Sequence, residues 1–321
     1  MYKTLEETVQ AIETGALLHI SGSESLLRRL PRGNWIGGST EYFMMPGGGA
    51  VMDTHLAVQT LPSRAFAIRT YTAETIGSIS GHVYEDGVSV VILPFDSEVL
   101  WNYSKRTDSA EELRPDNIIG WVSGQNLDAA EQVPCAVDGR SGTVYGDRAV
   151  ALHVRLPAGL RAQVHNINFF KPDMEGPLLE FLEDSQVITR CLIDGEETLF
   201  ANYLRARGIG ADTPLMGDYF GKLVNVSIKT VIGGRVNLYA PVFKGIEYRM
   251  AKPLTRYADA FRRKISAIDG APAALSFNCF LNFLYGGMEG EDQGAFYGPV
   301  GFGEVAGRLV NHQTLVYLQI T

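Results

Sequence analysis

Three residues in the last part of the chain have side chains that together suit nucleophilic catalysis. Cys279 ends an apolar run and is flanked by Asn278 and Asn282, and Glu304 and His312 follow further along. A histidine can take the proton of a thiol, and a carboxylate can orient the histidine. This set would make a cysteine-dependent amidohydrolase or deamidase. The commoner role of a free cysteine is that of a buried thiol, and this is the role we expect.

The segment Gly298–Glu304 predicts a ligand-binding turn. Gly298, Gly301 and Gly303 bracket Pro299 and Phe302, so we expect at least one glycine with a positive φ and a main chain open to close approach. Glu304 could then accept hydrogen bonds from a ligand ammonium group. The alternative is a structural turn in which Glu304 caps a helix or pairs with an arginine. The ligand-binding residues predicted from this region are Asn278, Cys279, Asn282, Tyr297, Phe302, Gly303, Glu304, Asn311, His312 and Gln313.

A second glycine-rich turn lies in the first part of the chain. Gly37 and Gly38 precede Ser39, Thr40 and Glu41. Backbone amides that follow a strand can bind an anion, so these last three residues complete the predicted ligand set. The turn lacks the lysine of a P-loop, and a simple strand-crossing turn is the commoner structure for such a segment.

The sequence around these residues predicts the helices and strands that position them, and together these elements indicate a mixed α/β fold (α+β). Short apolar runs alternate with helical patterns, and Lys171–Pro177 has no periodicity and two prolines, which is typical of a linker. We expect two packed halves, 1–172 and 178–321, each a mixed β-sheet covered by helices, with the ligand pocket at their junction. Segment 104–146 is polar and long, and it predicts an excursion from the core that could bind a partner.

Composition excludes several functional classes. The 321 residues carry a net charge of −8, which argues against binding the nucleic-acid phosphate backbone. No apolar run reaches the roughly 20 residues that span a bilayer, and the acidic start is unlike a secretory signal. Three cysteines and six histidines show no metal-ligand spacing, so we expect no metal and free thiols in the cytoplasm.

Two regions resemble FIST domains, a family of bacterial sensory modules. The resemblance rests on Ala274–Cys279, Gly298–Val305 and Asn311–Leu315, and on Ile36–Glu41 in the first half. The arginine that often follows the family's cysteine is missing here, and no signalling output module is attached. The resemblance implies a stand-alone sensor.

A FIST-like sensor would bind a small molecule, such as an amino acid, and would signal to a separate protein without catalysis. Some family members bind haem, so a haem-binding sensor is a further alternative, with His82, His165, His312 or Tyr297 as the axial ligand. The sequence selects none of these four residues and otherwise predicts no cofactor. The leading prediction is a cytoplasmic small-molecule sensor.

Overall fold

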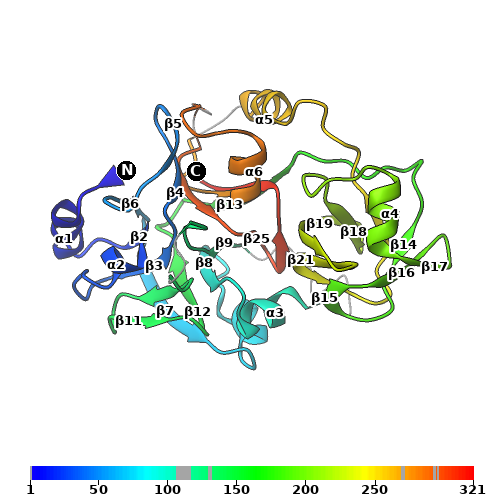
Figure 1. The fold of residues 1–321 in the computed structure, drawn as a ribbon. Helices are drawn as coiled ribbons and strands as arrows, with labels where there is room; N and C mark the ends of the chain where they lie inside the picture. The colour runs from blue at the N-terminus through cyan, green and yellow to red at the C-terminus, as the bar shows by residue number, and fades with distance from the viewer. Residues whose placement is uncertain (1, 106–116, 129–131, 269–271, 292–293, 295) are drawn as a thin grey trace.

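The structure is a computed structural model that describes residues 2–105, 117–128, 132–268, 272–291, 294 and 296–321 (Figure 1). It is mostly β, with five open sheets in the described residues. The helices are short: α1 (Leu5–Glu13), α2 (Glu24–Leu27), α3 (Glu98–Ser104), α4 (Phe200–Ala206), α5 (Tyr257–Ser266), α6 (Phe280–Tyr285) and a 3₁₀ helix (Ile76–His82). So few helices do not cover the sheets, and the prediction of two helix-covered halves is corrected to a β-rich mixed fold.

Three six-stranded sheets form the main body. The first sheet has the order β1 (Tyr2–Lys3), β6 (Leu56–Thr60), β2 (Leu18–Gly22), β3 (Trp35–Ser39), β10 (Ala136–Asp138) and β11 (Thr143–Tyr145). The second has the order β26 (Leu309–Asn311), β25 (Glu304–Ala306), β9 (Ile118–Ser123), β8 (Gly87–Pro94), β12 (Ala149–Arg155) and β7 (Ala65–Tyr71). The third has the order β13 (Ala162–Asn168), β27 (Thr314–Ile320), β23 (Leu275–Cys279), β24 (Gly298–Gly301), β4 (Tyr42–Met45) and β5 (Gly48–Val51).

The main body joins distant parts of the chain. In the third sheet, β24 lies between β23 and β4, and β13 pairs with β27 along seven residues. In the second sheet, β25 pairs with β9. Strands from both sides of the linker predicted at 171–177 therefore complete the same sheets.

A separate module follows β13. Its two sheets have the orders β17 (Glu196–Leu199), β16 (Arg190–Ile193), β14 (Leu179–Glu180), β22 (Tyr248–Met250), β18 (Leu215–Tyr219), β19 (Lys222–Val226), and β15 (Ser185–Ile188), β21 (Arg235–Val242), β20 (Ile228–Ile232). The buried residues of its hydrophobic core all come from Leu179 to Met250. In Figure 1 this module stands beside the main body.

The prediction of an excursion over 104–146 is wrong for Ile118–Ser123, which is strand β9 in the core. All six of its residues are buried, and it runs parallel to β8, whose eight residues are also buried. A strand buried on both faces reads as a continuous apolar run without alternation. Residues 106–116 and 129–131 of the predicted excursion lie outside the described residues.

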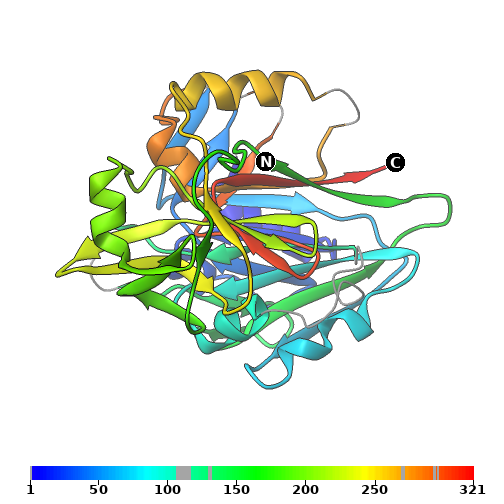
Figure 2. The same ribbon diagram turned by 90° about the vertical axis from the view of Figure 1, so that its right-hand side faces the viewer.

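Helices lie at the margins of the sheets. The capping box between Thr4 and Glu7 starts α1. Figure 2 shows α5 and α3 on opposite sides of the strands. Of the helices that the structure describes, none is long and apolar enough to cross a membrane.

Candidate functional site

A cavity of about 200 Å³ lies between the main body and the module. One wall comes from the end of β8 and from α3, and the other from β21, β15 and the segment around β26. Its lining therefore comes from both sides of the predicted linker. The lining residues are Asp96, Ser97, Glu98, Leu100, Trp101, Ser104, Gln186, Tyr239, Ala240, Pro241, Val310 and His312.

His312 is the predicted site residue that the structure places in this cavity. It lies in the tight turn between β26 and β27, where Gln313 has a φ of 54°. The amide Nδ2 of Asn225 donates to the His312 carbonyl at 3.0 Å. Gln313 Nε2 donates to the Asp212 carbonyl at 2.8 Å, and the Ser227 hydroxyl donates to Gln313 Oε1 at 2.6 Å. The module thus fixes the turn that carries the imidazole.

The His312 side chain is buried and incompletely satisfied. It is 2% exposed, and its Nδ1 has no hydrogen-bond partner among the described residues. Burial lowers the pKa of His312 to about 4, and hydrogen bonds with the backbone of Asn225 and Phe302 oppose this shift. The imidazole is therefore neutral at pH 7. A buried polar atom without a partner carries a free-energy cost, which a ligand or an ordered water would relieve.

Aromatic rings form a wall beside this imidazole. The ring of Tyr239 lies 5.9 Å from that of His312 and 6.0 Å from that of Phe95. Burial raises the pKa of Tyr239 to about 12, so its hydroxyl keeps its proton at neutral pH. The ammonium Nζ of Lys229 lies 5.0 Å from the Phe95 centroid and 5.9 Å from the Tyr239 centroid. The rings of Phe95 and Tyr239 therefore already make cation–π contacts with Lys229.

Two exposed carboxylates stand at the rim, where β8 leads into α3. Ser97 caps α3, because its hydroxyl accepts from the Leu100 amide at 3.3 Å and donates to the Pro94 carbonyl at 2.6 Å. Asp96 and Glu98 flank this cap, and Asp96 has a φ of 60°. Neither carboxylate forms an ion pair with a described residue. As far as the described residues go, both carboxylates can face a ligand.

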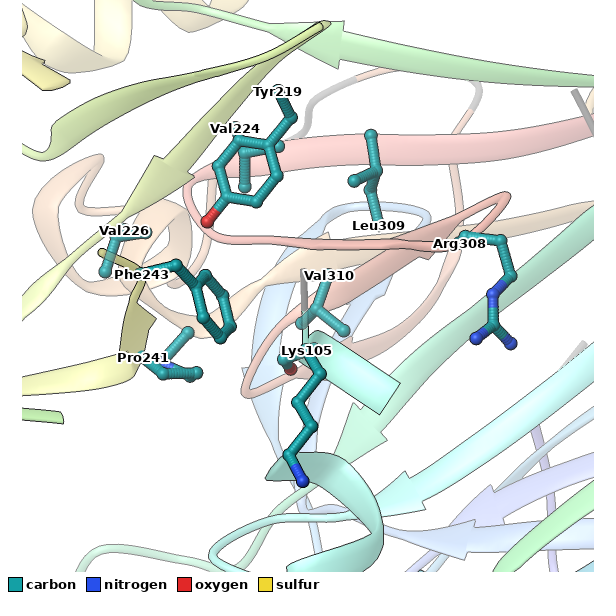
Figure 3. A pocket seen from close by; sticks show the side chains of 11 residues that line it. Lys105, Tyr219, Val224, Val226, Pro241, Phe243, Arg308, Leu309 and Val310 are labelled. Carbon is teal, nitrogen blue, oxygen red and sulfur yellow. The ribbon is translucent and has the colours of Figure 1, made fainter. Parts of the chain in front are cut away.

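A narrow hollow continues from the cavity towards β18 and β19 (Figure 3). It shares Ser104, Ala240, Pro241 and Val310 with the cavity, and Figure 3 shows the side chains of Lys105 and Arg308 beside it. Its volume is about 10 Å³. That is about the space of a single water, so the ligand space is the larger cavity.

The predicted residues Ser39, Thr40 and Glu41 hold the fold together away from this cavity. The Ser39 hydroxyl donates to the Gly124 carbonyl at 2.8 Å, and the Thr40 hydroxyl donates to the Val300 carbonyl at 2.8 Å. The carboxylate of Glu41 accepts from amide groups of Asn126 and Gln132. These contacts use up the polar atoms that a ligand would need.

The predicted residues around Cys279 form a buried polar cluster behind the cavity. Glu304 Oε2 accepts from the Thr314 hydroxyl at 2.8 Å and from the Thr314 amide at 3.3 Å, and Glu304 Oε1 has no hydrogen-bond partner among the described residues. Burial, and then the neighbouring Glu304, raise the pKa of Cys279 well above its ordinary value. Burial also raises the pKa of Glu304 well above its ordinary value. A neutral thiol is the opposite of what nucleophilic catalysis requires.

The remaining predicted site residues do not line the cavity. Asn278 Oδ1 accepts from Asn282 Nδ2 at 2.8 Å, and the hydroxyl of Tyr257 donates to Asn282. Both amide atoms of Asn311 lack a described partner. The other predicted residues, Tyr297, Phe302 and Gly303, do not line the cavity, although Phe302 packs on Phe95 at 5.2 Å.

The residues suggested as haem ligands are not brought together. His82 interacts with the Tyr71 hydroxyl at 3.0 Å, and His165 stacks on Tyr317 at 4.5 Å. Within the described residues, no group of three or more His, Cys, Asp or Glu side chains could hold a metal ion.

Sequence reasoning missed the cavity residues Asp96, Glu98, Trp101 and Tyr239. One signal was available, because Asp96 and Glu98 stand where a buried strand ends and a helix begins, and functional residues concentrate at such strand ends. Tyr239 and Trp101 gave no signal, since an aromatic residue in an apolar run is usually part of the core.

Comparison with known proteins places the chain by family alone. A family model described as a family of unknown function (DUF6976) matches residues 3–321. No curated protein and no solved structure matches the chain. The resemblance to FIST domains is therefore wrong, because the model that spans nearly the whole chain is that of another family. The motifs that carry the resemblance are short glycine and strand patterns, which unrelated folds share.

Proposed function

The chain belongs to the DUF6976 family, whose function is unknown, and we propose from its own geometry that it binds a small molecule between the main body and the module. The observation that carries the proposal is the buried His312, whose Nδ1 has no partner and which lines a cavity of about 200 Å³. Such a volume is many times the roughly 10–15 Å³ that one water needs by the same measure, so it can hold a small metabolite.

Binding rather than catalysis is the function that these residues support. None of the described lining residues is a cysteine, and Cys279 carries a protonated thiol at neutral pH. The lining joins two separately packed cores, so a bound ligand would also stabilise their contact. This linkage suits a sensor, in which occupancy of the cavity reports to a separate signalling protein. That partner and a cytoplasmic location stay predictions from the sequence.

Native mass spectrometry of the purified full chain tests the proposal. We expect a bound small molecule, or a mass shift when a mixture of metabolites is added. The same experiment is repeated with His312→Phe, which keeps a ring against Tyr239, and with Ala240→Leu, which fills part of the cavity. A ligand at 100 times its Kd stabilises the fold by about 2.7 kcal/mol, so a rise in the urea midpoint supplies a second readout.

Both variants should lose the ligand while they keep a cooperative urea transition, and either variant suffices if the other unfolds. A ligand that binds wild type and both folded variants equally would show that the cavity is not the site. Wild-type protein that binds nothing would contradict the proposal itself.

A further inference from the structure

The cavity has a charge pattern that selects among small molecules. Of its described lining residues, Asp96 and Glu98 are acidic, none is Lys or Arg, and His312 is neutral at pH 7. Among the described residues, an anionic ligand would meet two carboxylates without an ion-pair partner and no lining cation. A cationic ligand would meet carboxylates at the rim and aromatic rings along the wall.

The aromatic wall gives independent support for a cation. Lys229 Nζ already lies 5.9 Å from the Tyr239 centroid, although Lys229 is an exposed residue on β20. A ligand ammonium group could take the place of this lysine on the ring face. Trp101 supplies a second ring in the lining, and Leu100, Pro241 and Val310 supply apolar surface.

His312 places a neutral polar ring in the lining of the cavity. His312 is neutral, and hydrogen bonds with the backbone of Asn225 and Phe302 favour a proton on the ring. A neutral imidazole has one N–H and one lone pair. The nitrogen without a partner among the described residues is Nδ1, so we assign it the lone pair.

Building on the proposed function, we propose that the ligand is a small amine with an apolar body. Its ammonium group is held by the carboxylates of Asp96 and Glu98 and by the ring of Tyr239, and its apolar part lies against Trp101 and Val310.

Calorimetry of the full chain with three probes of one skeleton tests this class. The probes are 2-phenylethylamine, 2-phenylethanol and phenylacetate, which differ in charge and little in size. We expect the amine to bind at least about tenfold more tightly than the alcohol, a difference of about 1.4 kcal/mol, and the acid to bind more weakly still. The double variant Asp96→Asn, Glu98→Gln should weaken binding of the amine about tenfold.

Two further variants test whether the cavity prefers a cationic or an anionic ligand. Lys229→Met removes the cation that shares the Tyr239 ring, so it should tighten binding of the amine about two- to threefold, whereas a site for anions would be weakened. Glu85→Gln removes an exposed carboxylate at the opposite end of β8 and should leave the affinity unchanged. Equal losses in Glu85→Gln and in the double variant would overturn the placement of the ammonium group.

The outcomes separate this inference from the proposed function. Equal or tighter binding of the alcohol or the acid overturns the amine class. If native mass spectrometry finds a non-amine ligand that His312→Phe loses, the amine class is wrong and the cavity remains the binding site. If wild type binds no probe and carries no ligand, both proposals are wrong.

Discussion

Three buried histidines should make the protein sensitive to mild acid. His19, His153 and His312 are at most 2% exposed, and burial lowers the pKa of each to about 4. Each has a folded pKa below its unfolded value of about 6.5, so its stabilising contribution is complete above pH 6.5 and is lost as the pH falls towards 4. Between pH 6 and pH 5 the unfolded chain therefore binds nearly three protons that the folded chain does not.

Glu304 acts in the opposite direction. Burial raises its folded pKa well above its unfolded value, so the folded chain holds a proton that the unfolded chain lacks above about pH 4.5. The net difference between pH 6 and pH 5 is about two protons. The free energy of unfolding should then fall by about 2.7 kcal/mol per pH unit, at about 1.36 kcal/mol per proton.

Urea unfolding curves at pH 6.0, 5.5 and 5.0 measure this slope. His19→Gln removes one of the three histidines and should reduce the slope to about 1.4 kcal/mol per pH unit. Glu304→Gln removes the opposing group and should increase the slope to about 4 kcal/mol per pH unit. If both variants kept the wild-type slope, the reasoning from buried neutral groups would be refuted.

Three further predictions concern packing and reactivity. Thr40→Val should lower the free energy of unfolding by about 1–3 kcal/mol, measured in urea, because it leaves a buried carbonyl of β24 unpaired. Gly38→Ala should lower the free energy of unfolding by about 1–3 kcal/mol in the same assay, since a Cβ would lie 2.8 Å from the Trp121 indole. The control Gly77→Ala has open space around it and should change the free energy of unfolding by less than about 0.5 kcal/mol. Cys279 should react with iodoacetamide only after unfolding, and rapid labelling of the folded chain at pH 7 would contradict its buried, protonated state.

Local structure could be predicted from the sequence where one signal dominates. The pair Asp194-Gly195 is a sequence signal for a tight turn, and these residues have φ values of 49° and 84° between β16 and β17. Gly208 has a φ of 63° after α4, as a C-terminal glycine should. The sequence predicts a helix over 178–183, and this prediction is wrong, because Leu179–Glu180 is strand β14 and pairs on both sides. A short apolar run does not separate a helix from a buried strand.

The candidate site was less predictable, because it is a product of tertiary contact. Polar residues in a glycine-rich segment predict a ligand site, but polar atoms at crowded strand ends are equally needed to pair with buried backbone. Thr40 and Glu304 do this. Glu41 instead accepts from the side-chain amides of Asn126 and Gln132, and only His312 of the predicted set lines the cavity. The cavity itself joins Asp96 to Tyr239, a pairing that no local pattern contains.

The interleaving of the main body has a consequence for synthesis on the ribosome. β4, β9 and β13 are made early, yet their sheet neighbours β24, β25 and β27 emerge last. Contacts of such long sequence separation form slowly, and a strand that waits for its partner is an exposed edge. The module, whose strands are close in sequence, can pack while the chain is still growing, so the need for chaperone protection falls on the main body, which is completed only after the last strands have left the ribosome.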